Sequence, residues 1–160
     1  MKNYWFTLFF GFLLISSIQK ASGQLFTGGN IGFNFDNYGT VFDASPIVGY
    51  RINKLEVGLA PFLTYTMPNE GDNEYLFGNR VFSKYHVAKG LFLHAEFETV
   101  NYPVPETETR KWSVGLPLGA GYEQKIGQIR VHASVLYDVL LDEDTGKKNP
   151  IYRGGIVYDF

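Results

Sequence analysis

A histidine and a serine two residues apart, His132 and Ser134, form the pair that most directly suggests chemistry. In a β-strand, side chains two apart share a face, and a histidine beside a serine can act as the base that activates its hydroxyl. Glu143 is the acid that would complete a triad, but it falls in a predicted loop beyond the strand. Two polar side chains that merely share the inward face of a strand give the same His-x-Ser spacing. We favour that interpretation and expect no catalytic residue.

Metal and cofactor sites are not indicated either. His86, His94 and His132 lie on the polar faces of their segments, where imidazoles could bind a metal. They are expected at different distances from the ends of their strands, which would keep them apart. The chain has no Cys, which excludes thiolate ligands and disulfides. Gly28 and Gly29 lie within a strand pattern rather than in a phosphate-binding loop before a helix. We therefore expect no metal and no cofactor.

Composition narrows the class of protein. The chain has 160 residues, enough for one domain, and 17% of them are aromatic, which favours strands. The formal net charge of −2 argues against a nucleic-acid partner.

The first segment, residues 1–23, has the pattern of a cleavable signal peptide. Lys2 precedes an apolar run over residues 5–15, and Ala21, Ser22 and Gly23 supply small side chains before the cut. Eleven apolar residues rise only about 16 Å as a helix, roughly half of a bilayer core, which argues against a membrane anchor. Residues 24–160 then form a single domain.

The rest of the chain alternates between apolar and polar residues with the period of two that is typical of strands. Most of the alternating segments have the 9–11 residues or slightly more that a tilted membrane-spanning strand requires. Eight segments are predicted, over residues 27–36, 44–52, 55–66, 75–87, 91–101, 111–123, 128–140 and 150–160.

The connections between these segments alternate in length. Short turns are predicted around residues 53–54, 88–90 and 126–127, and longer polar loops over residues 37–43, 67–74, 102–110 and 141–149. This asymmetry is typical of outer-membrane barrels, in which the short turns face the periplasm.

Charge decides which face of each segment meets lipid. The central positions of the apolar faces hold no Asp, Glu, Lys or Arg, whereas the opposite faces hold both signs of charge and all three histidines. A soluble barrel would have the reverse arrangement. We therefore predict an all-β fold: a closed antiparallel eight-stranded up-and-down transmembrane β-barrel. Its interior is just wide enough for side chains to fill, so the charged side chains should form an ion-pair network that leaves no pore. The network residues are Arg51, Glu56, Arg80, Lys84, Glu96, Glu98, Arg130, Asp138 and Arg153, and Asp159 shares their face.

Aromatic residues on the lipid-facing positions gather at the two ends of the strands, where their rings favour the headgroup level. Four residues do not fit the alternation of apolar and polar residues along the strands. Local β-bulges would explain them, or a one-residue register shift in the case of Asn79 and Ser83. The four residues are Pro61, Asn79, Ser83 and Pro117. The loop-side aromatic girdle is Tyr65, Trp112, Tyr137 and Tyr152, and the turn-side girdle is Tyr50, Tyr85, Tyr122, Tyr158 and Phe160.

The last strand resembles the terminal signal that the insertion machinery of outer-membrane barrels reads, with Gly155, Tyr158 and Phe160 matching its pattern and Tyr152 matching loosely. Together with residues 44–51 and 55–58, which resemble an early hairpin, it makes residues 25–160 similar to small OmpA/OmpX-type barrels, above all those common in Bacteroidota. The resemblance implies a place in the bacterial outer membrane, with membrane lipids and the insertion machinery as partners.

Two functions are expected from these observations. The first is a non-enzymatic barrel that acts as a structural or interaction protein through its extracellular loops, or as a subunit of a larger membrane complex. The alternative is a lipid-modifying enzyme similar to lipid A deacylase barrels, which use a His-x-Ser pair with an acidic partner on the lipid-facing surface. His132 and Ser134 have the required spacing but are predicted to face inward.

Overall fold

The computed structural model describes residues 23–36, 39–69, 73–104, 109–142, 145, 147 and 149–160. The predicted signal peptide, apart from Gly23, and the candidate acid Glu143 lie outside these residues. The described part of the chain contains no helix long and apolar enough to cross a membrane. Its strands are β1 (Gly23–Asp36), β2 (Gly39–Ile52), β3 (Leu55–Pro68), β4 (Glu74–His86), β5 (Leu91–Pro103), β6 (Arg110–Gly115), β7 (Pro117–Ile126), β8 (Ile129–Asp138) and β9 (Ile151–Asp159).

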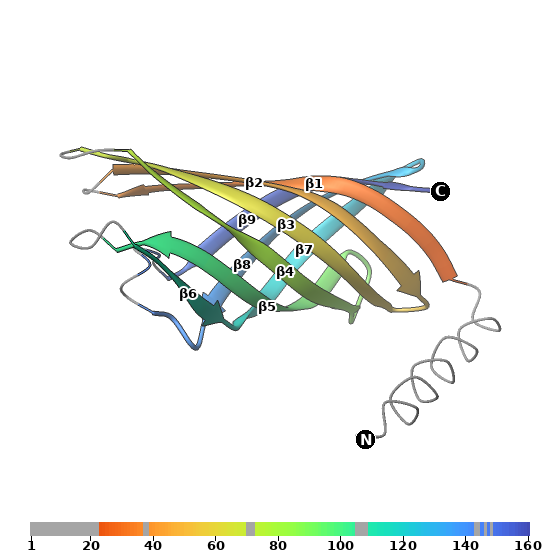
Figure 1. Cartoon of the computed structure of the whole chain (residues 1–160). Helices are drawn as coiled ribbons and strands as arrows, with labels where there is room; N and C mark the ends of the chain where they lie inside the picture. The colour runs from red at the N-terminus through yellow and green to blue at the C-terminus, as the bar shows by residue number, and fades with distance from the viewer. Residues whose placement is uncertain are drawn as a thin grey trace, which may run out of the picture.

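The strands close into an antiparallel up-and-down barrel (Figure 1). The order is β4-β3-β2-β1-β9-β8-β7-β5-β6, and a further pairing between β4 and β5 completes the ring. β6 and β7 occupy one position beside β5, because both pair with it in a single register, from Glu98 opposite Gly115 to Ala95 opposite Leu118. The barrel therefore has the eight strand positions that the alternation predicted.

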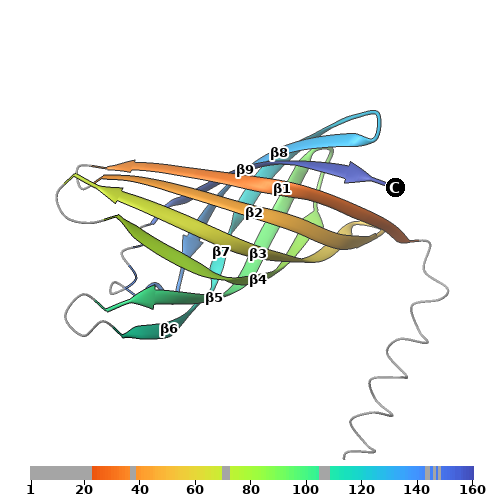
Figure 2. The same ribbon diagram turned by 45° about the horizontal axis from the view of Figure 1, so that its top comes forward.

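The two ends of the barrel differ. The short turns after β2, β4 and β7 lie at the end where the chain leaves β9, and the longer connections lie at the opposite end (Figures 1 and 2). We call these the turn end and the loop end. Positive backbone φ angles at Asn53, Gly90 and Gly127 allow the tight reversals at the turn end. On the loop side β2 already begins at Gly39, so most of the predicted loop over residues 37–43 is strand.

The predicted bulges are absent, and this expectation was wrong. At Pro61 the β2–β3 ladder keeps one register on both sides of a three-residue gap, from Ala44 opposite Leu63 to Val48 opposite Leu59. Pro46 lies opposite Pro61 in that register, so the two residues that lack an N–H face each other and the gap needs no inserted residue.

The other misfit residues also lie in regular register. Asn79 pairs with Pro61 on one side and with Thr99 on the other, and Ser83 continues the same ladder. At Pro117 the ladder to β5 is interrupted only at Leu116, with no residue inserted.

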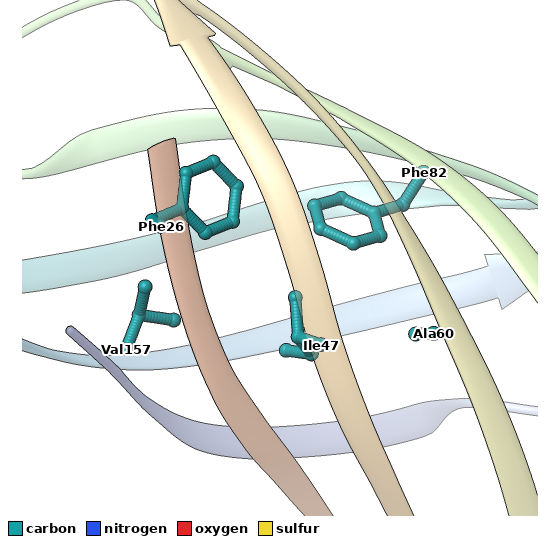
Figure 3. Close-up of a cluster of buried hydrophobic side chains, with 5 residues drawn as sticks. All are labelled: Phe26, Ile47, Ala60, Phe82 and Val157. Carbon is teal, nitrogen blue, oxygen red and sulfur yellow. The ribbon is translucent and has the colours of Figure 1, made fainter. Parts of the chain in front are cut away.

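The core of the fold is the barrel interior. Burial alternates along the strands, most regularly in β8, whose ten residues are alternately exposed and buried. The interior holds apolar side chains as well as charges. One cluster joins Phe26, Ile47, Ala60, Phe82 and Val157 from five different strands (Figure 3). The sequence prediction assigned charged side chains to the interior and did not include this apolar cluster.

Candidate functional site: the charged barrel interior

All nine residues predicted for the internal network point into the barrel. Eight are buried, and the side chain of Arg51 retains 19% of its exposure because it lies near the turn-end opening. Regular alternation in β2, β3, β4, β5, β8 and β9 places them there, since inward positions recur at every second residue. Their contacts divide them into two clusters separated by a layer of rings.

The turn-end cluster contains three cationic and three acidic side chains. Arg130 is at its centre: its Nη1 lies 2.7 Å from both Glu56 Oε1 and Glu123 Oε2, and its Nε donates to Asp159 Oδ1 over 2.7 Å. Arg51 also pairs with Glu56 and lies 3.2 Å from Glu123. The members of the turn-end cluster are Arg51, Lys125, Arg130, Glu56, Glu123 and Asp159.

The loop-end cluster repeats this balance nearer the loops. Arg80 holds Asp43 through two nitrogens, with Nη2 2.8 Å from Oδ2 and Nη1 3.1 Å from Oδ1, and its Nε donates to Glu98. Arg153 Nη2 lies 3.0 Å from Glu96 Oε2. The members of the loop-end cluster are Arg80, Lys147, Arg153, Asp43, Glu96 and Glu98. Because each cluster holds three charges of each sign, each can be neutral by itself.

Lys147 reaches the loop-end cluster from the connection between β8 and β9. Its ammonium pairs with Glu98 and lies 5.0 Å from the centroid of Phe62. Burial lowers the pKa of Lys147, and the Glu98 carboxylate opposes that shift. Thr145 from the same connection is also buried, so this segment covers part of the loop end of the interior.

Lys84 lies between the clusters and forms no ion pair with a carboxylate among the described residues. Its Nζ lies 4.9 Å from the ring centroid of Phe92 and 5.7 Å from that of Phe82, a cation–π geometry. His94 and His132 pack edge-on against Phe92, at centroid distances of 6.0 and 6.3 Å. Aromatic and imidazole rings thus form the layer that separates the two clusters.

Asp138 was predicted to join the network, but it has a different role. Its Oδ1 accepts hydrogen bonds from the backbone N–H groups of Leu116 and Leu140, at 2.8 and 3.0 Å. It forms no ion pair with the cations that the structure describes. The carboxylate replaces a ladder partner beside Pro117, where β6 gives way to β7.

Sequence reasoning missed four cluster members. Lys125 fell between the predicted strand over residues 111–123 and the predicted turn around residues 126–127. Asp43 was assigned to a loop, although extending the alternation of β2 by one step from Ser45 would have placed it inward. Glu123 ends the predicted strand over residues 111–123, on its polar face, but was not included in the network. Lys147 carries no periodic signal, because the folding of a connection decides where its side chain goes.

The candidate catalytic pair is buried in the interior and does not form a dyad. His132 Nε2 lies 2.9 Å from Asn30 Oδ1, and Ser134 Oγ has no hydrogen-bond partner among the described residues. Both side chains face away from the outer surface, where a membrane lipid would approach. The geometry gives no support to serine chemistry here.

The ring of Phe92 packs against all three histidines, and their nitrogens do not form a group of potential metal ligands among the described residues. Among the described residues, one group brings potential metal ligands together: Glu56, His86 and Glu123 have one ligand atom each within 4.8 Å of one another. Guanidinium nitrogens of Arg51 and Arg130 already contact both carboxylates. A cation would have to compete with two arginines, so this geometry favours the ion pairs.

The residues matching the insertion signal lie on β9 and just beyond it. Tyr158 and Phe160 are exposed, and their rings pack edge-on with centroids 5.2 Å apart. Gly155 faces inward, where a Cβ atom would collide with Asn30 and with the backbone of Gly29. A packing requirement therefore explains the glycine independently of recognition.

Comparisons with known proteins match the architecture alone. No protein-family model and no curated protein matches the chain. A structure titled "De novo design of transmembrane beta-barrels" is 21% identical, with a TM-score of 0.41, over 89% of this chain and 98% of that one. Neisserial surface protein A (NspA) is 15% identical, with a TM-score of 0.47, over 86% of this chain and 97% of that one. Identities this low are compatible with unrelated functions, so the function has to be inferred from this chain's own side chains.

Proposed function

We propose that the chain is an integral protein of the bacterial outer membrane, a non-enzymatic barrel with a closed interior that acts through its loops or as a subunit of a larger membrane complex. One observation carries the proposal: large apolar side chains cover the outside while charged side chains are buried. Leu59, Leu93 and Ile156 are 54%, 53% and 58% exposed, whereas Arg130 and Glu98 are 0% and 1% exposed.

The outside of the barrel is too apolar for water. Soluble monomers rarely expose a continuous apolar patch larger than a few hundred Å². Here exposed Leu, Val, Ile and Phe side chains occur on nearly every strand around the ring. Hydrocarbon is the solvent that suits such a surface, and a closed barrel can enter it because no strand edge is left unpaired at its middle.

Exposed aromatic residues support the same placement. Trp112, Tyr137 and Tyr152 lie towards the loop end, and Tyr85 and Tyr122 towards the turn end, all outward-facing. Amphipathic rings favour the two headgroup layers, so the strands between them would cross the hydrocarbon. The short turns would then face the periplasm and the longer loops the exterior.

The interior favours a structural or interaction role over transport or catalysis. Two ion-pair clusters and a layer of rings lie in the barrel interior, which supports a closed interior. The longer connections at the loop end are then the surfaces available to a partner. We propose no catalytic role for His132 and Ser134.

Subcellular fractionation tests the membrane placement. We expect the full-length chain, expressed in a Gram-negative host, to be recovered in the outer-membrane fraction, to require detergent for extraction and to migrate faster unheated than boiled. Recovery in the soluble periplasmic fraction would contradict the proposal. A matched variant with Leu93→Glu on the outside should accumulate less in the membrane, because a carboxylate there would face hydrocarbon.

A further inference from the structure

The outer wall of the barrel carries a single charged side chain among the outward-facing strand residues whose side chains the structure describes. That residue is Arg110, the first residue of β6, at the loop end. Every other such position holds an apolar, aromatic, small or uncharged polar residue. A lone cation on such a wall calls for a physical explanation, because a charge facing lipid is costly without a partner.

The guanidinium of Arg110 is held in place by the neighbouring strands. Its Nη2 donates to the backbone carbonyls of Tyr75 and Asn101 over 2.9 and 3.0 Å, and its Nε donates to Asn101 Oδ1. Its Cζ lies 5.0 Å from the ring centroid of Phe77. Nη1 makes no hydrogen bond with the described residues, and no described carboxylate pairs with the group. One donor edge is therefore preoriented and unused.

The ring of Phe77 that contacts this guanidinium has aromatic neighbours. Trp112 packs edge-on against Phe77, with centroids 6.1 Å apart and an interplanar angle of 88°. Tyr75 packs against Tyr65 on the next strand at 4.8 Å. Trp112 and Tyr65 belong to the loop-side aromatic girdle, which in the proposed orientation lies at the headgroup level of the external leaflet.

We propose that Arg110 binds the phosphate group of an anionic membrane lipid, with Trp112 and Phe77 packing against the lipid beside it. The inference rests on the proposed membrane placement. A guanidinium matches phosphate in charge and in the spacing of its donors, and headgroup phosphates are the anions nearest to this level of the wall. The bound phosphate would supply the negative charge that no described carboxylate gives to Arg110.

Trp112 provides a direct reporter for a test. The chain contains two tryptophans, and the other is Trp5, so a full-length chain with Trp5→Phe has its one tryptophan beside the site. We would refold it in non-ionic detergent micelles and follow Trp112 emission while adding phosphatidylglycerol. Parallel titrations use diacylglycerol, which lacks the phosphate, and inorganic phosphate, which lacks the lipid. We expect a saturable change with phosphatidylglycerol alone.

Variants locate the site. Arg110→Gln should weaken the apparent affinity for phosphatidylglycerol about tenfold, the effect of losing one charged hydrogen bond. Arg110→Lys should fall between, because it keeps the charge without the planar fork. Lys54→Gln, at an exposed lysine of the turn end, is the matched control and should titrate like the parent.

Four results would overturn the site: an unchanged affinity in Arg110→Gln, an equal loss in Lys54→Gln, an equal response to inorganic phosphate, or an equal response to diacylglycerol. All four presuppose a parent chain that forms a heat-modifiable barrel in micelles. A parent that fails to do so contradicts the proposed membrane placement itself, so the two failures can be told apart.

Discussion

At the scale of single residues, a charged side chain can be buried in this barrel because its counter-ions are buried with it. Removing an ion from water is costly, and the attraction between partners offsets that cost only if each charge keeps its counterpart. Arg130 illustrates this, because one fully buried guanidinium contacts Glu56, Glu123 and Asp159. The cluster is best regarded as a unit that excludes other arrangements, rather than as a sum of stabilising pairs.

Arg130→Met should therefore be severely destabilising. The substitution leaves three carboxylates short of a cation in a buried site, and we expect a loss of about 3–5 kcal/mol in the free energy of unfolding. Urea unfolding in lipid vesicles, followed by gel mobility, measures it. Lys125→Met is the control, because the Lys125 side chain is 51% exposed and its pairing with Asp159 is screened by water. Equal losses in the two variants would contradict the central role of Arg130.

Neighbouring glycines on β9 give a second test at this scale. A Cβ at Gly155 would lie against Asn30 and against the backbone oxygen of Gly29, whereas a Cβ at Gly154 would meet nothing closer than 3.8 Å. We predict that Gly155→Ala costs about 1–3 kcal/mol of unfolding free energy and that Gly154→Ala changes it by less than about 1 kcal/mol. The same unfolding assay checks both. A Gly154→Ala variant as unstable as Gly155→Ala would mean that the inward packing is wrong.

At the scale of strands, facing prolines interrupt the β2–β3 ladder. Pro46 and Pro61 lie opposite one another, and the ladder lacks the three pairs around them. Pro61→Val would restore one N–H at an outward position without filling the interior, and we expect a gain of about 1 kcal/mol in the free energy of unfolding. Leu59→Val, two residues away, is the control for the loss of apolar surface. If the free energy of unfolding of Pro61→Val did not exceed that of the control, the backbone N–H that Pro61 lacks would not limit the stability of the ladder.

The strands also show how much of this fold a sequence can predict. Period-two alternation predicted the eight strand positions. It also predicted that Glu56, Arg130 and the other network residues point inward, because counting along one strand fixes the direction of each side chain. Which charges meet could not be predicted, since Arg130 reaches Glu56 across the barrel, 74 residues away. The position of Lys147 in the loop-end cluster could not be predicted either, because Lys147 lies in a connection without periodicity.

At the scale of the whole molecule, the proposed closed interior predicts a barrel without a conducting pathway. The charged side chains of the interior pair with one another in a cluster near each end, and aromatic rings lie between the two clusters. In a planar lipid bilayer the full-length chain should show no stable single-channel current. Steps of constant conductance would contradict a closed interior, while leaving the orientation of the outer wall in place.

We infer that the apolar side of each strand faces hydrocarbon, and β8 is the strand on which this can be measured. The chain has no native cysteine, so single cysteines at Val131 and Val135, outward, and at Ser134, inward, can each carry a spin label. In lipid vesicles, labels at Val131 and Val135 should collide often with oxygen, which concentrates in hydrocarbon, and rarely with a water-soluble nickel chelate. The label at Ser134 should be sheltered from both. Frequent nickel collisions at Val131 and Val135, with oxygen favoured at Ser134, would show that the two sides have been assigned the wrong way round.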